Sequence, residues 1–271
     1  MKSRKDIANL IFDKININKE GLKNQFRASK KEIGFFFLDD LLPKEFALEI
    51  YKKFPRIEET VKRKSFRELK HTAYQMDKYD ALLEEVIYAF QDIRIVKLVG
   101  EICEIEEISA DEKLYAGGLS LMGKENFLNP HLDNSHDKDR NRWRVLNLLY
   151  YVTPNWELEN GGNLEIWPKG IKDKQTTIES KFNRLVVMAT HQKSWHSVSK
   201  VEVDAIRCCV SNYYFSSTPL LNSDTFHVTT FRGRPTEKIK DFVLQIDNSI
   251  RQSLRVLFKK GVRENPHQYK K

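Results

Sequence analysis

The spacing of apolar residues predicts helices near the N-terminus. In residues 1–31 the apolar positions recur at helical steps, at Ile7, Leu10, Ile11, Leu22 and Phe26. Such a stripe gives a helix one apolar face, so short packed helices are expected here. The apolar run from Gly34 to Leu42 predicts a strand, and Pro43 suits the first turn of a helix through about Phe54.

A polar segment and then a longer helical pattern follow. Residues 55–78 are polar and basic without a clean period, which favours a surface connection over a loop beside a binding site. Asp80 is the expected N-cap of a long amphipathic helix, because its carboxylate can accept from the first free N–H groups. The apolar positions of that helix are Leu83, Val86, Ile87, Phe90, Val96, Val99 and Ile102. We expect it to pack on the outside of a sheet.

From Glu112 to Phe215 the pattern changes to short apolar runs separated by turn residues. The separators include Gly117-Gly118, Gly123, Pro154-Asn155, Gly161-Gly162 and Pro168-Lys169-Gly170. Many short strands at this spacing predict a two-sheet jelly roll.

A second helical pattern closes the chain. Pro235 opens a run whose apolar positions are Ile239, Phe242, Val243, Ile246, Ile250 and Leu254. The helix is expected to end before Gly261. A stripe of this kind usually faces a core or a docking partner, and a partner-binding helix is the less favoured of the two. No internal repeat or low-complexity linker divides the chain, which favours one domain with helical additions.

Composition narrows the class of protein. The chain has 271 residues, 40% hydrophobic and 31% charged, enough to bury a substantial core. No stretch approaches the roughly 20 apolar residues of a membrane span. The first apolar run is interrupted by Asn9, unlike a signal peptide, so a cytoplasmic protein is expected. Cys103, Cys208 and Cys209 suggest neither a disulfide framework nor a zinc site, and are expected to be buried.

The net charge of +8 raises the question of an acidic partner. Basic residues concentrate at Lys52-Lys53, at Lys62-Arg63-Lys64 with Arg67 and Lys70, and in the tail from Arg251 to Lys271. Solvated helix faces on a basic protein are the simpler explanation. Attraction of an anionic substrate or of nucleic acid is the alternative.

A candidate metal site begins with a His-x-Asp pair. If residues 129–134 are extended, His131 and Asp133 share a face while Leu132 turns into the core. His196, in a second β-like segment, could supply a third ligand. Two imidazoles and one carboxylate form the facial triad of non-haem Fe(II) oxygenases. The spacing alone is weak, because a solvated histidine beside a capping aspartate gives the same pattern.

A strand after His196 strengthens this hypothesis. Arg207 opens a run rich in β-branched and aromatic residues that ends at Phe215. In a strand Arg207, Cys209, Ser211 and Tyr213 would share one face. A guanidinium on a buried face needs an anion, which would be either a ligand carboxylate or an acidic residue of the protein.

The order and spacing of these residues resemble the Fe(II)/2-oxoglutarate-dependent dioxygenases, in particular the prolyl 4-hydroxylase-like branch. The resemblance runs from about Leu114 to Phe215, with a looser echo in residues 34–43. It implies an α+β protein whose jelly roll is a double-stranded β-helix with flanking N-terminal and C-terminal helices. It also implies a domain organisation: an N-terminal helical extension over 1–31, the dioxygenase domain over 32–217 with its core at about 112–217, and a C-terminal helical extension over 218–271.

The resemblance assigns expected roles to particular residues. The iron ligands would be His131, Asp133 and His196, and the residues holding 2-oxoglutarate would be Arg207, Ser211, Tyr151 and Asn147. Arg207 would bind the distal carboxylate, with Ser211 and Tyr151 assisting. Asn147 stands where some relatives have threonine. A tyrosine that some relatives carry before the His-x-Asp is missing near Ser120, Leu121 and Met122, where Tyr115 could substitute.

The expected function is hydroxylation of an unactivated C–H bond with Fe(II), 2-oxoglutarate and O₂, and with decarboxylation of 2-oxoglutarate to succinate. The favoured substrate is a polar small molecule or biosynthetic intermediate, with Arg144 the candidate to reach it. A peptidyl prolyl hydroxylase is the alternative. A non-catalytic binding protein is less favoured, and so is a nucleic-acid demethylase, because Tyr213 stands where that pattern has a second arginine. The sequence does not fix the oligomeric state.

Overall fold

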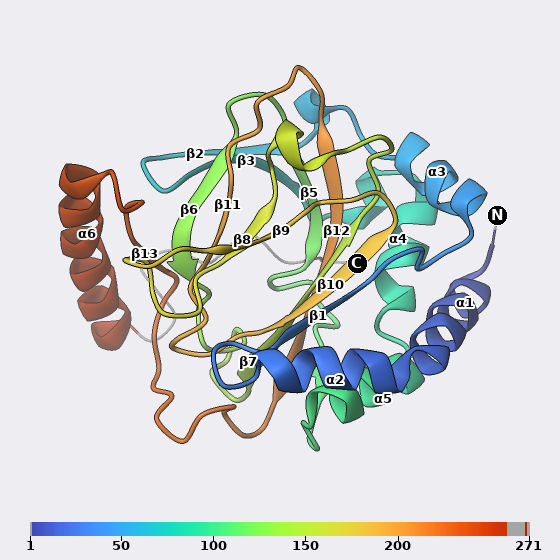
Figure 1. The fold of residues 1–271 in the computed structure, drawn as a ribbon, viewed down its shortest axis with the longest axis horizontal. Coiled ribbons are helices and arrows are strands. Elements are labelled where there is room, and N and C mark those ends of the chain that lie inside the picture. The colour runs from blue at the N-terminus through green and yellow to red at the C-terminus, as the bar shows by residue number, and fades with distance from the viewer. Residues whose placement is uncertain (1, 259–268, 270–271) are drawn as a thin grey trace.

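The computed structural model describes residues 2–258 and Tyr269, and shows a curled β-sheet with helices on two sides (Figure 1). The helices are α1 (Arg4–Ile17), α2 (Lys19–Ser29), α3 (Lys44–Lys52), α4 (Ala81–Ala89), α5 (Ile93–Cys103) and α6 (Lys238–Leu257). In Figure 1, α1, α2, α4 and α5 lie together on one side of the sheet, and α6 lies beyond its opposite edge.

The strands form one sheet in which every named pairing is antiparallel. They are β1 (Phe35–Leu38), β2 (Val61–Lys64), β3 (Glu68–Ala73), β4 (Ser109–Ala110), β5 (Gly118–Met122), β6 (Phe127–Leu132), β7 (Trp143–Tyr151), β8 (Leu164–Ile166), β9 (Thr176–Ile178), β10 (Arg184–Ala189), β11 (His196–Val198), β12 (Arg207–Ser216) and β13 (Thr230–Phe231). Their order is β1-β10-β7-β12-β5-β3-β6-β11-β8-β9, with β2 beside β3, β4 beside β12 and β13 beside β6.

Strand β3 joins two groups of strands into a half-barrel. It pairs with β5 through His71–Ala73 and with β6 through Glu68 and Leu69. One group is β1-β10-β7-β12-β5 and the other is β6-β11-β8-β9. This curled antiparallel sheet confirms the expected jelly-roll core with flanking helices.

The apolar core lies between the first group of strands and the helical layer. Phe36, Tyr150 and Tyr214 are fully buried on the strands, and they belong to one cluster with Leu83 of α4 and Val99 of α5. This packing confirms the expected short N-terminal helices and helices outside the sheet. A second apolar cluster lies between the two groups of strands, where Tyr151 and Cys209 meet Leu164 and Ile166 of β8.

Two local expectations were wrong. The single helix expected after Asp80 is two helices, because Asp92 interrupts the run and caps α5 by accepting from the Arg94 N–H. Asp80 does cap α4. Residues 55–78 contain β2 and β3 rather than a plain surface connection. Strand β3 is stabilised by hydrogen bonds to β5 and β6, which the local pattern does not reveal.

Helix α6 turns its apolar stripe outward. Ile239 is 84% exposed and Phe242 is 65% exposed, so the stripe is not a core face in this chain. The polar face packs inward, where Asp241 pairs with Arg232 and Asp247 pairs with Arg67. The helix ends at Leu257, and the region around Gly261 lies outside the described residues.

The cysteines and the helices can also be compared with the expectations from composition. Cys103, Cys208 and Cys209 are buried and unbridged, as expected. Among the described residues, no helix has both the length and the apolar character needed to cross a membrane.

Candidate active site

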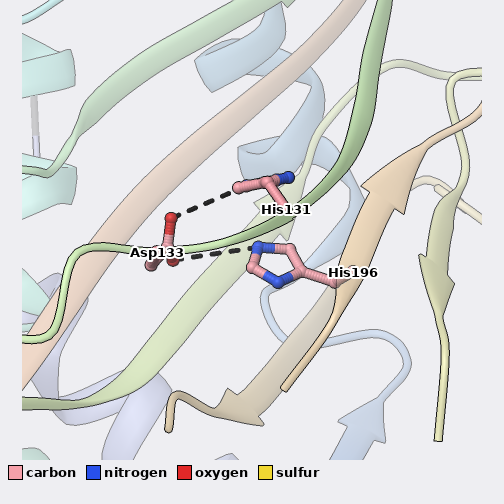
Figure 2. A group of neighbouring side chains, drawn as sticks. All are labelled: His131, Asp133 and His196. Carbon is pink, nitrogen blue, oxygen red and sulfur yellow. Dashed lines mark ion pairs between the residues drawn. The ribbon is translucent and has the colours of Figure 1, made fainter. Parts of the chain in front are cut away.

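Two histidines meet because their strands pair in register. His131 on β6 is the direct partner of His196 on β11, so both side chains point to the same face of the sheet. Their ring centroids are 4.0 Å apart. Asp133 follows β6 two residues after His131 and turns toward both rings (Figure 2). The spacing within the His-x-Asp pair therefore places three possible ligands on one face.

The three side chains form a compact, nearly buried group. One ligand atom from each lies within 4.8 Å of the others. The Asp133 carboxylate lies 3.6 Å from His131 Nε2 and 3.8 Å from His196 Nε2, and these contacts are drawn in Figure 2. The Asp133 Oδ2 atom is buried without a hydrogen-bond partner. A buried carboxylate oxygen with no donor fits a site that holds a cation.

The hydrogen bond made by Nδ1 of each histidine fixes the ring so that Nε2 points toward Asp133. His131 Nδ1 lies 3.0 Å from the Asn129 carbonyl oxygen, and His196 Nδ1 lies 2.9 Å from that of Ser194. A carbonyl oxygen only accepts, so both Nδ1 atoms carry the proton and both Nε2 atoms present lone pairs toward Asp133. Orientation of ligand histidines by such carbonyl contacts is common in metal sites. The donor set fits Fe(II).

Burial and charge favour the ligand forms of these groups. Burial, together with the nearby His131, lowers the pKa of His196 to about 4, so the imidazole is neutral at pH 7. For Asp133, burial alone would raise the pKa. The interactions with His131, His196 and Arg144 outweigh that effect and lower the pKa of Asp133 well below its ordinary value.

A cavity of about 930 Å³ opens over this group. It is lined by the three metal-ligand candidates and by Arg207, Ser211, Asn147 and Arg144. Tyr151 lies below the cavity lining, fully buried, and the Arg207 guanidinium lies 5.4 Å from its ring centroid. The structure thus brings the expected site residues to one side of the half-barrel.

Arg207 has no anionic partner among the described residues. Its Nη1 donates to the Gly162 carbonyl at 3.1 Å and its Nη2 donates to Ser120 Oγ at 3.2 Å. Its Nε is buried without a hydrogen bond. The alternative of an arginine paired with a buried acid of the protein is therefore wrong for residues 2–258. A buried guanidinium in this state suits a ligand carboxylate.

The other residues expected to bind 2-oxoglutarate differ in their contacts with Arg207 and with the cavity. The hydroxyl that contacts Arg207 is that of Ser120, whereas Ser211 lies farther along the cavity face of β12. The Tyr151 hydroxyl and the Asn147 carbonyl oxygen are buried with no hydrogen bond. Asn147 donates through Nδ2 to the Tyr213 hydroxyl at 3.1 Å. A buried acceptor and a buried hydroxyl near the cavity are both suited to a bound molecule.

Arg144 lies beside the metal-ligand candidates. It is 6% exposed, its Nη1 lies 3.8 Å from Asp133 Oδ1, and its guanidinium stacks 4.4 Å from the Tyr213 ring centroid. His191 contacts the Ile33 carbonyl oxygen and lies outside the metal-ligand group.

Several lining residues were missed or misjudged from the sequence. His136 is 5% exposed and lines the cavity. Ser120 and Thr72 reach the cavity because β5 and β3 pair with each other. Arg251 and Arg255 reach it from α6. The concentration of Arg and Lys in these segments was the available signal, but tertiary pairing decides which side chains point inward.

The fold and the site define a class: a β half-barrel that presents a two-histidine, one-carboxylate group in an open cavity. Residues 117–215 match the family model described as the 2OG-Fe(II) oxygenase superfamily. This match covers the strands that carry His131, His196 and Arg207, and it supports an enzyme of the 2OG-Fe(II) oxygenase type.

Several solved structures have a similar fold. A prolyl-4-hydroxylase from Pseudomonas putida is 17% identical, covers 71% of this chain and 97% of its own, and gives a TM-score of 0.52. A prolyl hydroxylase from Trichoplax adhaerens, in complex with a hypoxia inducible factor peptide fragment, is 18% identical with coverages of 73% and 91% and a TM-score of 0.50. HygX from Streptomyces hygroscopicus, with nickel, 2-oxoglutarate and hygromycin B bound, is 10% identical with coverages of 76% and 90% and a TM-score of 0.50. At these identities the likeness is one of fold.

Proposed function

We propose that His131, Asp133 and His196 hold Fe(II), and that Arg207 binds the distal carboxylate of 2-oxoglutarate. The observation that carries this proposal is one cavity with two bare imidazole nitrogens, a carboxylate and a buried arginine without a protein anion. The bound iron would supply the activation of O₂ that protein side chains cannot provide. The proposal includes the domain organisation, with the dioxygenase domain spanning residues 32–217 between helical extensions.

The chain's own residues would place the cosubstrate and exclude water. Arg207 offers charge-assisted hydrogen bonds to the distal carboxylate, with Ser120 beside it. Tyr151 and Asn147 offer one buried donor and one buried acceptor, and Ser211 a hydroxyl on the cavity wall. Together these groups would hold 2-oxoglutarate in a single orientation.

The proposed reaction is hydroxylation of an unactivated C–H bond of a polar small molecule or biosynthetic intermediate, with decarboxylation of 2-oxoglutarate to succinate. The cavity walls support a polar substrate, because residues 55–78 and 134–142 contribute charged side chains such as Arg63, Lys70 and Asp139 to the lining. HygX, whose structure has hygromycin B bound, has a similar fold. Peptidyl prolyl hydroxylation is the second candidate, since prolyl hydroxylases share this fold.

An anaerobic titration tests the cofactor assignment. Fe(II) and 2-oxoglutarate added together to the protein should give the weak visible charge-transfer band of a bidentate chelate. The variant His131→Ala should lose the band while keeping its far-UV circular dichroism, because the metal is not part of the core. His191→Ala is the matched control, and its band should be unchanged. A band of equal strength in His131→Ala would contradict the proposed ligand set.

Succinate formation then separates the substrate classes. Free amino acids, sugar nucleotides and proline-containing peptides are compared for stimulation of succinate release above the rate without substrate. Stimulation by a polar small molecule supports the first candidate, and stimulation by peptides alone supports the second. Stimulation only by a hydrophobic fatty acid would contradict a polar substrate.

A further inference from the structure

Cationic side chains crowd the cavity beyond those that the cosubstrate needs. Besides Arg144 and Arg207, the cations in the lining are Arg63, Arg67, Lys70, Lys138, Arg251 and Arg255. The acids in the lining, besides Asp133, are Glu68 and Asp139. This excess gives the cavity a positive field that would attract and retain anions.

Some of these cations already have acidic partners. Arg67 and Arg251 share Asp247, and Arg251 Nε lies 2.9 Å from its carboxylate. Lys70 lies 3.0 Å from Glu68. These cations are largely compensated within the protein. Arg144 and Arg255 lack a comparable acidic partner in the described chain.

Arg144 is buried and poorly paired. Its nearest acid is Asp133 at 3.8 Å, and its Nε is buried without any hydrogen bond. If Asp133 holds the metal, as proposed above, its negative charge is shared with the cation and Arg144 loses most of its compensation. A buried guanidinium of this kind is costly unless an anion is bound beside it.

Arg255 and His136 add further donors on the same side. The Arg255 side chain lines the cavity and makes no ion pair in the described chain, while its backbone carbonyl accepts from Arg140 Nη2 at 2.8 Å. His136 Nε2 is buried and unpartnered. Burial, followed by the charges of Arg144, Arg140 and Arg255, lowers the pKa of His136 to about 3. The imidazole is therefore neutral, and these positive groups lie near one another.

This cationic end lies apart from the cosubstrate anchor. Arg207 is the first residue of β12, whereas Arg144 pairs with Phe215 near the other end of that strand. A 2-oxoglutarate carboxylate at Arg207 would leave Arg144 and Arg255 without an anion. A second anionic group is needed there, and the substrate is the molecule that can bring it.

We propose that Arg144 and Arg255 bind a phosphate group of the substrate, so that the enzyme acts on a phosphorylated small molecule. This inference rests on the proposed function of the same cavity. A phosphate monoester carries up to two negative charges and several acceptor oxygens, which match two guanidinium groups without anions and a neutral imidazole better than one carboxylate does. The phosphate would hold the molecule in place while another of its carbons faces the metal site.

A nucleic acid fits this arrangement less well. Arg144 and Arg255 line the cavity, and the Arg144 guanidinium already covers one face of the Tyr213 ring beside it, so that face is not available to stack on a base. Small phosphate esters meet neither obstacle.

The test measures by calorimetry how tightly the protein binds inorganic phosphate. The protein is first loaded with Ni(II) and 2-oxoglutarate, so that Arg207 is already bound to the cosubstrate carboxylate. Ionic strength is held constant with chloride. The expected result is one saturable site per chain, weakened roughly tenfold or more in Arg255→Gln and in Arg144→Gln. Lys238→Gln is the matched control, because it removes one positive charge from an exposed position of the same helix. Its affinity should stay within about twofold of the parent.

The outcomes separate this inference from the proposed function. Absence of saturable phosphate binding, or equal affinity in the parent and in Arg255→Gln, overturns the phosphate site. Binding of single-stranded DNA without binding of phosphate also overturns it, in favour of a nucleic-acid substrate. The Fe(II) and 2-oxoglutarate band of the same preparation reports on the cofactor site. If the band is present without phosphate binding, only this inference fails. If the band is absent, the proposed function fails, and with it the assignment of the phosphate to a substrate.

Discussion

Arg207 and Arg144 are both buried arginines with an unpartnered Nε, yet their surroundings differ. Arg207 keeps two hydrogen bonds to neutral oxygens, from Gly162 and Ser120. Arg144 has a distant carboxylate and the aromatic rings of Tyr213 and Phe215. Arg207, held by neutral acceptors, keeps its full charge for a ligand. Arg144 is compensated by one carboxylate at 3.8 Å, so it too can bind an anion when that carboxylate holds a metal.

Substitution of the cosubstrate anchor should have graded effects. Arg207→Ala removes a charge-assisted contact and should weaken 2-oxoglutarate binding by about 2–5 kcal/mol. Ser120→Ala and Ser211→Ala should each cost about 1 kcal/mol or less, with Ser120→Ala the larger because its hydroxyl contacts Arg207. The measurement is the 2-oxoglutarate concentration at half-maximal charge-transfer band. Equal effects of all three changes would place the distal carboxylate elsewhere.

The pKa of His136 predicts an acid-sensitive fold. Its pKa is about 3 in the folded protein, compared with about 6.5 for an unperturbed histidine. Between these values the unfolded chain binds a proton that the folded chain does not. Stability should therefore fall as the pH decreases from about 6.5 toward 3, by up to about 1.4 kcal/mol per pH unit from this residue.

Urea unfolding of the metal-free protein at several pH values measures this slope. The variant His136→Gln cannot take up the proton, so its stability should depend less steeply on pH over the same range. Identical slopes in the two proteins would show that His136 is not buried as a neutral group.

At the scale of single elements, α6 differs from the other helices in what attaches it. Helices α1, α2, α4 and α5 bury apolar residues in the main core. Helix α6 buries Leu244 in a small separate cluster and is otherwise held through ion pairs and side-chain amides. Ion pairs at the surface are weakened by salt, but apolar burial is not. The two parts of the helical framework should therefore respond differently to ionic strength.

Limited proteolysis can detect this difference. Cleavage within residues 232–257 should become faster as salt is added, and Asp247→Asn should raise the rate already at low salt, because Arg67 and Arg251 lose a shared partner. The expected loss is about 1 kcal/mol, since the pairs are partly exposed. Asp204→Asn, at an exposed position, is the control and should leave the rate unchanged. Salt-independent cleavage would show that apolar contacts hold the helix.

The elements also show what the sequence could and could not predict. The period of apolar positions was sufficient for α1, α2 and the many short strands, because each buries one face. The break at Asp92 was missed because apolar positions continue on both sides of it. Strand β3 was missed because it is polar and its partners are far away in the sequence. The iron-ligand candidates were found because a local motif encodes them, whereas Ser120 and Arg255 depend on tertiary placement.

For the whole molecule, the cofactors should add to stability without being required for folding. The apolar core lies between the strands and the helical layer, away from the metal-ligand candidates. Ligands that bind only the folded state stabilise it by about 2.7 kcal/mol at a hundredfold excess over Kd. Mn(II) with 2-oxoglutarate should therefore raise the Tm of the parent protein by several degrees and leave that of His196→Ala unchanged. An equal rise in both proteins would indicate binding elsewhere.

The position of β3 has a consequence for the exchange of backbone amide hydrogens with solvent. The metal-ligand candidates belong to the group of strands with β6 and β11, and Arg207 belongs to the group with β12 and β7. Strand β3 meets β6 through only two residue pairs, Glu68 with Leu128 and Leu69 with Phe127. Short pairings open at lower free energy than long central ones. Amides where β3 pairs with β6 should therefore exchange before those of β7 and β10. Bound 2-oxoglutarate would connect the two groups of strands, so it should slow this exchange.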